Sequence, residues 1–324
     1  NRTANGVAID DDHNGFANDL FGWDFSQISE NSATTQLGLG DNDPFDEHRH
    51  GTHVSGILGA SGNNDLGVTG INWTVSLLPL RFLGADNKGS TSNAIRAINY
   101  ATMMRHTYEV SLTDPVIVDG SVGANIVVTN NSWGGSTSGG ALLREAIAAQ
   151  GAEDILFVAA AGNGNALGQG NDNDLRPFFP SNYDLENVIS VAAVDAADEL
   201  VPFSNFGVRS VDLAAPGLGI LSTVPGGQYR RRSGTSMAAP LVSGVATLIA
   251  AINPDATAAE IRDAILRSVE VVPSLAQSLS TGGRLNAFQA VSIDTVHPRA
   301  TLDVTNITDN DAGSTVQDFT VTYQ

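Results

Sequence analysis

The fold is decided by the stretch Ser233-Gly234-Thr235-Ser236-Met237-Ala238-Ala239-Pro240, which leads directly into a long apolar helix predicted for residues 241–251. The helix is apolar on all sides and rich in Ala and Gly, so it is expected to be buried with other backbones packed close to it. Pro240 fits a helix only in the first turn, where no intrahelical donor is lost. Ser236 then lies at the positive end of the helix dipole, where negative charge is stabilised. It either caps the helix or acts as a nucleophile.

Composition limits the classes of function that the chain can have. The 324 residues suffice for one large domain with a small appendage, and an apolar content of 42% suits a compact α/β core. The net charge of -19 disfavours nucleic acid as a partner. Because the chain has no cysteine, disulfides and thiol chemistry are excluded. We find no run of about 18 apolar residues and therefore expect no membrane span.

Apolar strands alternate with helices along the middle of the chain. We expect strands at 75–83, 125–130, 155–160, 188–194 and 211–217, helices at 91–105 and 141–150, and an irregular insertion at 106–123. The alternation indicates a parallel sheet covered on both faces by helices. Ligand sites of such sheets lie at the carboxyl ends of the strands. Asn163 and the stretch Ser132-Trp133-Gly134 both fall at such ends.

Two further motifs accompany the serine motif: His50-Gly51-Thr52-His53-Val54-Ser55-Gly56 and Ala159-Ala160-Ala161-Gly162-Asn163-Gly164. Together the three resemble, in the same order, the motifs of the subtilases, the subtilisin-like serine proteases. The resemblance implies an α/β, subtilisin-like three-layer fold with a mostly parallel sheet between helices. It also implies that Ser236 is the nucleophile, His50 the general base and the Asn163 side-chain amide an oxyanion donor.

The two histidines of the motif, His50 and His53, could instead share a metal ion on one face of a helix. However, no carboxylate follows in the zincin pattern, and no third ligand is evident. We therefore expect a helix to begin at His50, with Gly56 allowing close packing and His53 in a structural role.

An extended polypeptide substrate is also implied by the resemblance, bound by strand addition to two backbone segments. The residues expected to bind it are Gly89, Ser132, Trp133, Gly134, Ala161 and Gly162. The small side chains of residues 160–162 would leave room for a large substrate side chain before the scissile bond.

The triad aspartate departs from the family pattern. In subtilases it ends a short apolar strand and is followed by Thr-Gly or Ser-Gly, whereas Val7-Ala8-Ile9-Asp10 is followed by Asp11-Asp12. The Asp-rich loop and Gly22-Trp23-Asp24-Phe25 resemble subtilase segments that come after the aspartate strand. We therefore expect the triad aspartate upstream of residue 1, with Asp10 as the alternative.

A calcium loop is predicted near the N-terminus. Asp10, Asp12 and Asn14 stand at alternate positions and Asp19 follows, so their oxygens could converge on one Ca²⁺. It is not an EF-hand, because Phe21 stands where the bidentate glutamate would be. An acidic surface turn is the alternative.

Residues 1–295 form the predicted peptidase domain, and 296–324 have the character of a linker and the first strands of a β-sandwich. Two functions remain open. One is a serine endopeptidase that acts on polypeptides, is secreted or cell-surface, and is a monomeric catalytic domain within a larger multidomain protein. The other is a catalytically inactive, subtilase-like module that binds polypeptides. The intact His50, Asn163 and Ser236 favour the peptidase, since a binding module needs none of them.

Overall fold

The computed structural model describes residues 10, 14–26, 40–113, 123–136 and 140–293. The apolar residues 7–9, Asp12 and the segment 296–324 lie outside this part, so the predictions made on them are not addressed by the structure.

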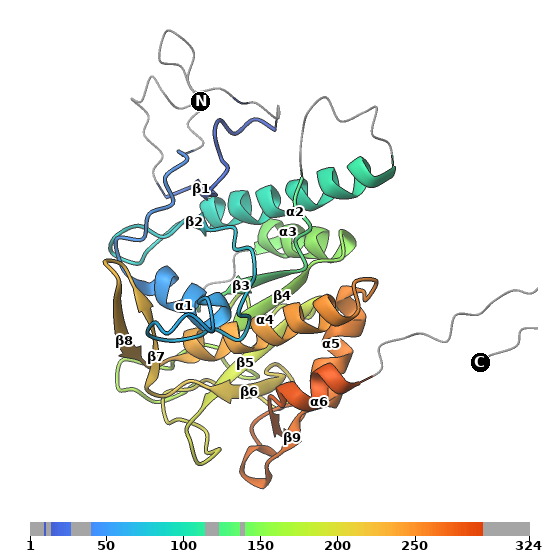
Figure 1. The fold of residues 1–324 in the computed structure, drawn as a ribbon. Helices are drawn as coiled ribbons and strands as arrows, with labels where there is room; N and C mark the ends of the chain where they lie inside the picture. The colour runs from blue at the N-terminus through green and yellow to red at the C-terminus, as the bar shows by residue number, and fades with distance from the viewer. Residues whose placement is uncertain (1–9, 11–13, 27–39, 114–122, 137–139, 294–324) are drawn as a thin grey trace, which may run out of the picture.

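A six-stranded sheet in the order β3-β4-β5-β6-β10-β9 forms the centre of the molecule (Figure 1). Its strands are β3 (Val128–Asn131), β4 (Leu156–Ala160), β5 (Val188–Val194), β6 (Leu213–Pro216), β10 (Gly283–Arg284) and β9 (Glu270–Val271). All neighbours are parallel except β9, which runs antiparallel to β10. The mostly parallel sheet predicted from the sequence is thus confirmed.

Both faces of the sheet are buried, which explains the continuous apolar strands. In β4, Leu156, Val158 and Ala160 belong to the core cluster that includes α4 (Thr235–Ile252). Phe157 and Ala159 point to the opposite side and pack with residues of α3 (Gly140–Ala152). The strand therefore has no polar face.

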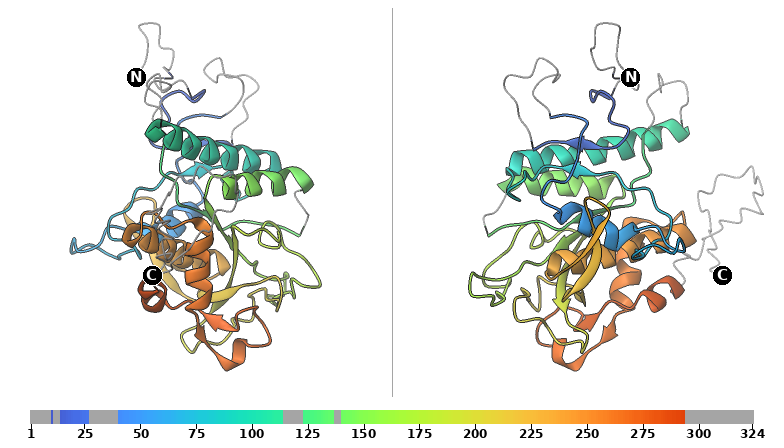
Figure 2. Two further views of the ribbon diagram at one scale, coloured as in Figure 1. Left: turned by 90° about the vertical axis from the view of Figure 1, so that its right-hand side faces the viewer. Right: turned by 60° about the vertical axis from the view of Figure 1, so that its left-hand side comes forward.

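Helices cover the two faces and complete three layers (Figures 1 and 2). α2 (Thr91–Thr113) packs on α3 on one side. On the other side α4 crosses the sheet and packs against α1 (His50–Gly59), α5 (Ala258–Arg267) and α6 (Ala287–Ser292). α5 begins with the capping box of Thr257 and Glu260, as its sequence favours.

One helix in the described part of the chain, α4, is long and apolar enough to cross a membrane by length and composition. The sequence prediction overlooked it as a candidate. However, 61% of its residues are buried, and it packs on β3, β4, β5 and β6. It is the core helix predicted from the residues after Ser236.

Three elements differ from the prediction. α2 continues to Thr113, so the irregular insertion begins later than residue 106. The strand expected at 75–83 is reduced to β2 (Leu80–Arg81), which pairs with β1 (Trp23–Asp24) in a separate two-stranded sheet. A hairpin of β7 (Ile220–Val224) and β8 (Gln228–Arg232) was not predicted, because the exposed β8 has no apolar periodicity.

The outer edge of β3 lies next to this separate sheet. Among the described strands, β3 pairs only with β4, and β2 pairs only with β1. The chain ends that follow β2 and β3 nevertheless meet, since the rings of Phe82 and Trp133 make an edge contact at 5.0 Å between centroids. The outer edge of β3 is therefore unpaired among the described strands, and its carboxyl end lies near the end of β2.

Candidate active site

A cleft of about 850 Å³ opens at the carboxyl ends of β3 and β4. It brings together Ser236, His50 and Asn163, which are more than 70 residues apart along the chain. Of the predicted substrate-binding residues, it is lined by Gly89, Ser132, Trp133, Gly134 and Gly162. Ala161 is not among the lining residues, because its side chain is 0% exposed and packs in the core under the sheet end.

Ser236 is the second residue of α4. The helix is preceded by Gly234 and has no side-chain cap, so Ser236 does not serve as the cap. Its Oγ donates to the backbone O of Ser132 at 3.3 Å, while the Ser132 Oγ donates to the backbone O of Ser236 at 2.9 Å. These two bonds fix the start of α4 against the end of β3 and leave the half-buried serine at the cleft wall.

Asn163 is held in one orientation by the residue before Ser236. Its Oδ1 accepts hydrogen bonds from the Thr235 backbone N–H at 2.8 Å and from Thr235 Oγ1 at 3.2 Å. Because the oxygen is thus occupied, the amide NH₂ is the end that can donate into the cleft. Gly162 precedes it with φ +110, and a Cβ there would collide with the Asn205 side chain. The approach of this loop to the cleft therefore requires glycine at 162.

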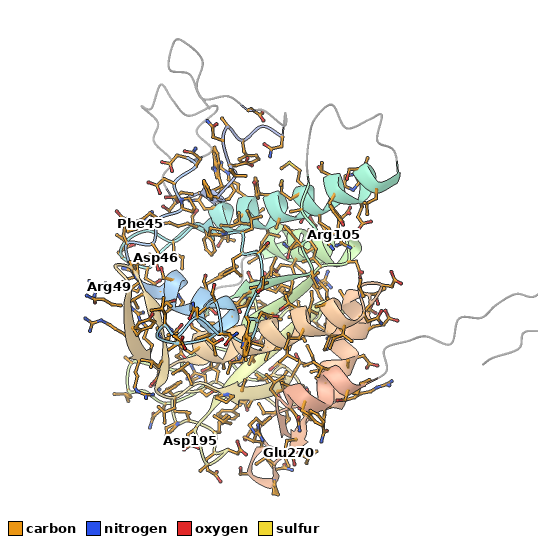
Figure 3. The ribbon with its side chains drawn as sticks, in the orientation of Figure 1. Phe45, Asp46, Arg49, Arg105, Asp195 and Glu270 are labelled. Atoms are coloured by element: carbon orange, nitrogen blue, oxygen red, sulfur yellow. The ribbon has the colours of Figure 1, made fainter. Side chains whose placement is uncertain are left out.

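His50 is the first residue of α1, as predicted, and Asp46 fixes this helix start. The Asp46 carboxylate accepts from the backbone N–H groups of His48, Arg49 and Thr52 at 3.0, 2.7 and 2.7 Å, and from Thr52 Oγ1 at 2.8 Å. Burial alone would raise the pKa of Asp46, but these hydrogen bonds lower it below its ordinary value. Figure 3 shows Asp46 and Arg49 at the start of α1.

The His50 imidazole is held neutral. Its pKa is lowered to about 4, first by burial and then by the positive charge of Arg232, while Asp46 acts in the opposite direction. No carboxylate in the described ranges is hydrogen bonded to the ring. A neutral imidazole can accept a proton at neutral pH, and a carboxylate placed against its other nitrogen would increase its basicity.

Comparison with known proteins decides the family. A sequence model of the Subtilase family matches residues 8–310 of the chain. The chain belongs to the subtilase family. It is 37% identical over 210 residues to subtilisin-like protease 2 of Plasmodium falciparum, covering 64% of this chain and 14% of that protein. It is 34% identical over 252 residues to a thermophilic serine proteinase of Bacillus sp. strain AK1, covering 78% and 54%.

A third relative, alkaline elastase YaB of Bacillus sp. strain YaB, is 34% identical over 219 residues, covering 67% of this subtilase and 49% of the elastase. The chain therefore spans about half the length, or less, of these relatives. The family and the relatives support a serine protease function, and the family resemblance inferred from the three motifs is confirmed.

His53 of this subtilase lies outside the cleft lining and is 0% exposed. Its Nε2 lies 2.9 Å from the backbone O of Arg230 in β8, and Ser222 of β7 donates to the His53 carbonyl at 2.7 Å. A Cβ on Gly56 would collide with the hydroxyls of Ser222 and Thr223. This face of α1 therefore anchors the β7–β8 hairpin. Within the described residues no group of three His, Cys, Asp or Glu side chains could hold a metal.

Phe178 is a cleft residue that the sequence analysis missed. A Cβ on Gly134 would collide with its ring, and a Cβ on Gly162 would lie 3.0 Å from its Cγ. The ring also lines the cleft. It therefore takes up part of the space that the small residues 160–162 were expected to leave open. No local pattern marked it, since Phe178 belongs to a loop far from every motif.

The acidic loop is described in part. Asp10 accepts from the backbone N–H groups of Asn14 and Gly15 at 3.2 and 2.8 Å. The Asn14 side-chain amide donates to Asp19 Oδ2 at 2.9 Å, and Tyr100 OH donates to the same oxygen. Hydrogen bonds thus link Asp10 and Asp19 to Asn14, and the calcium loop stays a prediction.

Proposed function

We propose that this subtilase is a serine endopeptidase that hydrolyses polypeptides through an acyl-enzyme. The observation that carries the proposal is the orientation of Asn163. Its amide NH₂ is presented to the cleft by Thr235, next to Ser236 at the positive end of α4 and in the same cleft as His50. Paired donors beside a serine are what a developing oxyanion requires, whereas a module that only binds polypeptides has no use for them.

The proposed reaction begins when the Ser236 hydroxyl rotates away from the Ser132 carbonyl towards His50. His50 accepts the hydroxyl proton as Oγ forms a bond to the substrate carbonyl carbon. The negative charge that develops on the carbonyl oxygen is stabilised by the Asn163 Nδ2–H and the Ser236 backbone N–H. Collapse breaks the C–N bond, and His50 gives its proton to the leaving amine. Water then attacks the acyl-enzyme by the same route and releases the acid.

The third member of the triad is, in this proposal, an aspartate upstream of residue 1. Three observations support it over Asp10. The His50 ring has no carboxylate partner in the described part of the chain. The Asp10 carboxylate accepts the backbone N–H groups of its own loop. The outer edge of β3 also has no paired strand among the described residues, and a parallel strand added there would end at the cleft, where the carboxyl end of β3 lies.

The test of the peptidase proposal is hydrolysis of casein by the full-length protein and by its Ser236→Ala variant. We expect the wild type to cleave and Ser236→Ala to lose cleavage while it keeps its circular dichroism spectrum and melting temperature. Ser292→Ala, which changes an exposed serine of α6, is the matched control and should remain active. Cleavage by purified Ser236→Ala would contradict the assignment. Polypeptide binding by a wild type that never cleaves would favour the inactive module instead.

We also propose a structural Ca²⁺ at the loop of Asp10, Asp12, Asn14 and Asp19. The hydrogen bonds from Asn14 to Asp10 and to Asp19, which hold the two carboxylates on one loop, support it, and oxygen donors are the ligands that Ca²⁺ prefers. A ligand that binds only the folded state stabilises it by about 2.7 kcal/mol at 100 times its Kd. Chelation should therefore lower the melting temperature of the full-length protein, and less so in an Asp10→Ala/Asp12→Ala double variant. An unchanged melting temperature would refute the site.

The domain organisation and the location of the protein are also proposals. We propose a peptidase domain over residues 1–295, followed at 296–324 by the first strands of a β-sandwich, in a secreted or cell-surface multidomain protein whose catalytic domain is monomeric. Cell fractionation and limited proteolysis of the full-length protein test these points. Protease-resistant product ending near residue 295 is the expected result.

A further inference from the structure

The cleft differs in charge from the rest of the molecule. The chain carries 35 acidic and 16 basic residues, yet no Asp or Glu lines the cleft in the described part of the chain. Its charged or titratable lining residues are instead Lys88, Arg232, His48 and His50. A cleft whose described lining carries only cationic charge, within an acidic molecule, attracts anionic groups.

Arg232, the last residue of β8, forms no ion pair with a carboxylate of the described residues. Six of the described arginines form ion pairs with Asp or Glu, and Arg232 is not one of them. Its Nη2 donates to the backbone O of His48 at 3.3 Å. A guanidinium has five N–H donors. The structure shows one described acceptor for them, the His48 carbonyl, so further N–H groups of Arg232 can donate to a substrate.

The nearest acidic residues in sequence to His48 are committed elsewhere. Asp46 accepts the N–H groups at the start of α1, and Glu47 pairs with Arg81 at 2.8 Å. Neither carboxylate is therefore available to neutralise Arg232. Among the described residues, the half-buried guanidinium lines the cleft with the neutral His48 carbonyl as its hydrogen-bond partner.

The position of Arg232 identifies the part of the substrate that it meets. In the proposed reaction His50 protonates the leaving amine, so the residues after the scissile bond pass on the His50 side of Ser236. Arg232 lies on this side, because it is hydrogen bonded to His48 and its charge acts on the His50 ring. Lys88 adjoins Gly89, one of the residues expected to bind the substrate backbone.

We propose that Arg232 binds a carboxylate side chain of the substrate within the first two residues after the scissile bond. The enzyme then prefers Asp or Glu there. This inference rests on the proposed peptidase function and adds a substrate class to it. A guanidinium matches a carboxylate with two parallel hydrogen bonds, which neither Lys88 nor a histidine can provide.

The experiment compares fluorogenic peptides that differ only by Glu or Gln at the first or the second position after the cleaved bond. The full-length wild type is expected to cleave a Glu peptide with a kcat/KM roughly fivefold above that of its Gln partner, the upper range for a solvent-accessible ion pair. The ratio should fall towards one as the salt concentration rises. In Arg232→Gln, kcat/KM should be equal for the Glu and the Gln peptide. In Arg232→Lys, part of the preference for the Glu peptide should remain.

The matched control is Arg231→Gln, which makes the same change of charge one residue earlier. Arg231 points its Nη1 to the Gly219 carbonyl and does not line the cleft, so this variant should keep the ratio. Equal hydrolysis of Glu and Gln peptides by the wild type, or a ratio that survives Arg232→Gln, would overturn the inference while leaving the peptidase proposal intact. No hydrolysis of any peptide, or of casein, would overturn both.

Discussion

Replacement of Asn163 by alanine is predicted to lower kcat about 10²- to 10³-fold, which is about 2.7–4 kcal/mol of barrier. The structure supplies the reason, because the Asn163 oxygen is occupied by two hydrogen bonds from Thr235. The NH₂ group therefore meets the oxyanion without reorganisation, and alanine removes this donor. KM should change little, since the bond strengthens only when negative charge develops.

The stability cost of the same substitution should be small. Asn163 is exposed, so water can replace its oxygen as the acceptor for Thr235, and we expect a loss of about 1 kcal/mol in the free energy of unfolding. The assay is steady-state hydrolysis of a fluorogenic peptide by the full-length protein, with urea unfolding alongside. Asn165→Ala, which alters an exposed asparagine two residues further on, is the control. An unchanged kcat, or a loss confined to KM, would refute the role of Asn163 as an oxyanion donor.

Three further predictions concern the walls of the cleft. Asp46→Ala should destabilise the chain by about 2 kcal/mol in urea unfolding and reduce kcat, because three backbone N–H groups around the start of α1 lose their acceptor; an unaltered unfolding midpoint would contradict this. Since the pKa of His50 is about 4 when folded and about 6.5 when unfolded, its stabilising contribution is full above pH 6.5 and is lost as the pH falls through 4. The free energy of unfolding of residues 1–324 should therefore fall by about 2 kcal/mol between pH 7 and 5 through this group. The fall should be smaller by that amount in His50→Gln, and unfolding curves of both proteins at the two pH values would measure it. Phe178→Ala should raise kcat/KM for peptides with a large aromatic side chain before the scissile bond relative to those with alanine; an unchanged ratio would show that the ring does not limit that space.

Local sequence patterns predicted the elements whose chemistry is uniform along their length. β5 begins and ends at the predicted residues, Val188 and Val194, because a strand buried on both faces is apolar at nearly every position, here at all but Ser190. The motif at 233–240 predicted both the buried helix α4 and the position of Ser236 at its start. The resemblance then indicated which of the residues at the strand ends would meet.

The features that the sequence did not reveal depend on contacts between distant segments. β8 is exposed and carries three consecutive arginines, so its pairing with β7 has no apolar signature. Asp46 supports the start of α1 by accepting from the backbone N–H groups of His48, Arg49 and Thr52, and no apolar periodicity marks this role. Phe178 and Arg232 enter the cleft from a loop and a hairpin whose paths are set by packing. A capping search upstream of His50 could have found Asp46, whereas no comparable signal exists for Phe178.

The most direct test of the central claim is the site at which a fluorophosphonate reacts with the full-length protein. The account predicts a single covalent adduct on Ser236, located by mass spectrometry of the digested protein, and its absence in Ser236→Ala. His50→Ala should slow the labelling strongly, because the serine loses the base that removes its proton. An adduct on another serine, or a protein that cleaves casein and yet leaves Ser236 unmodified, would contradict the account.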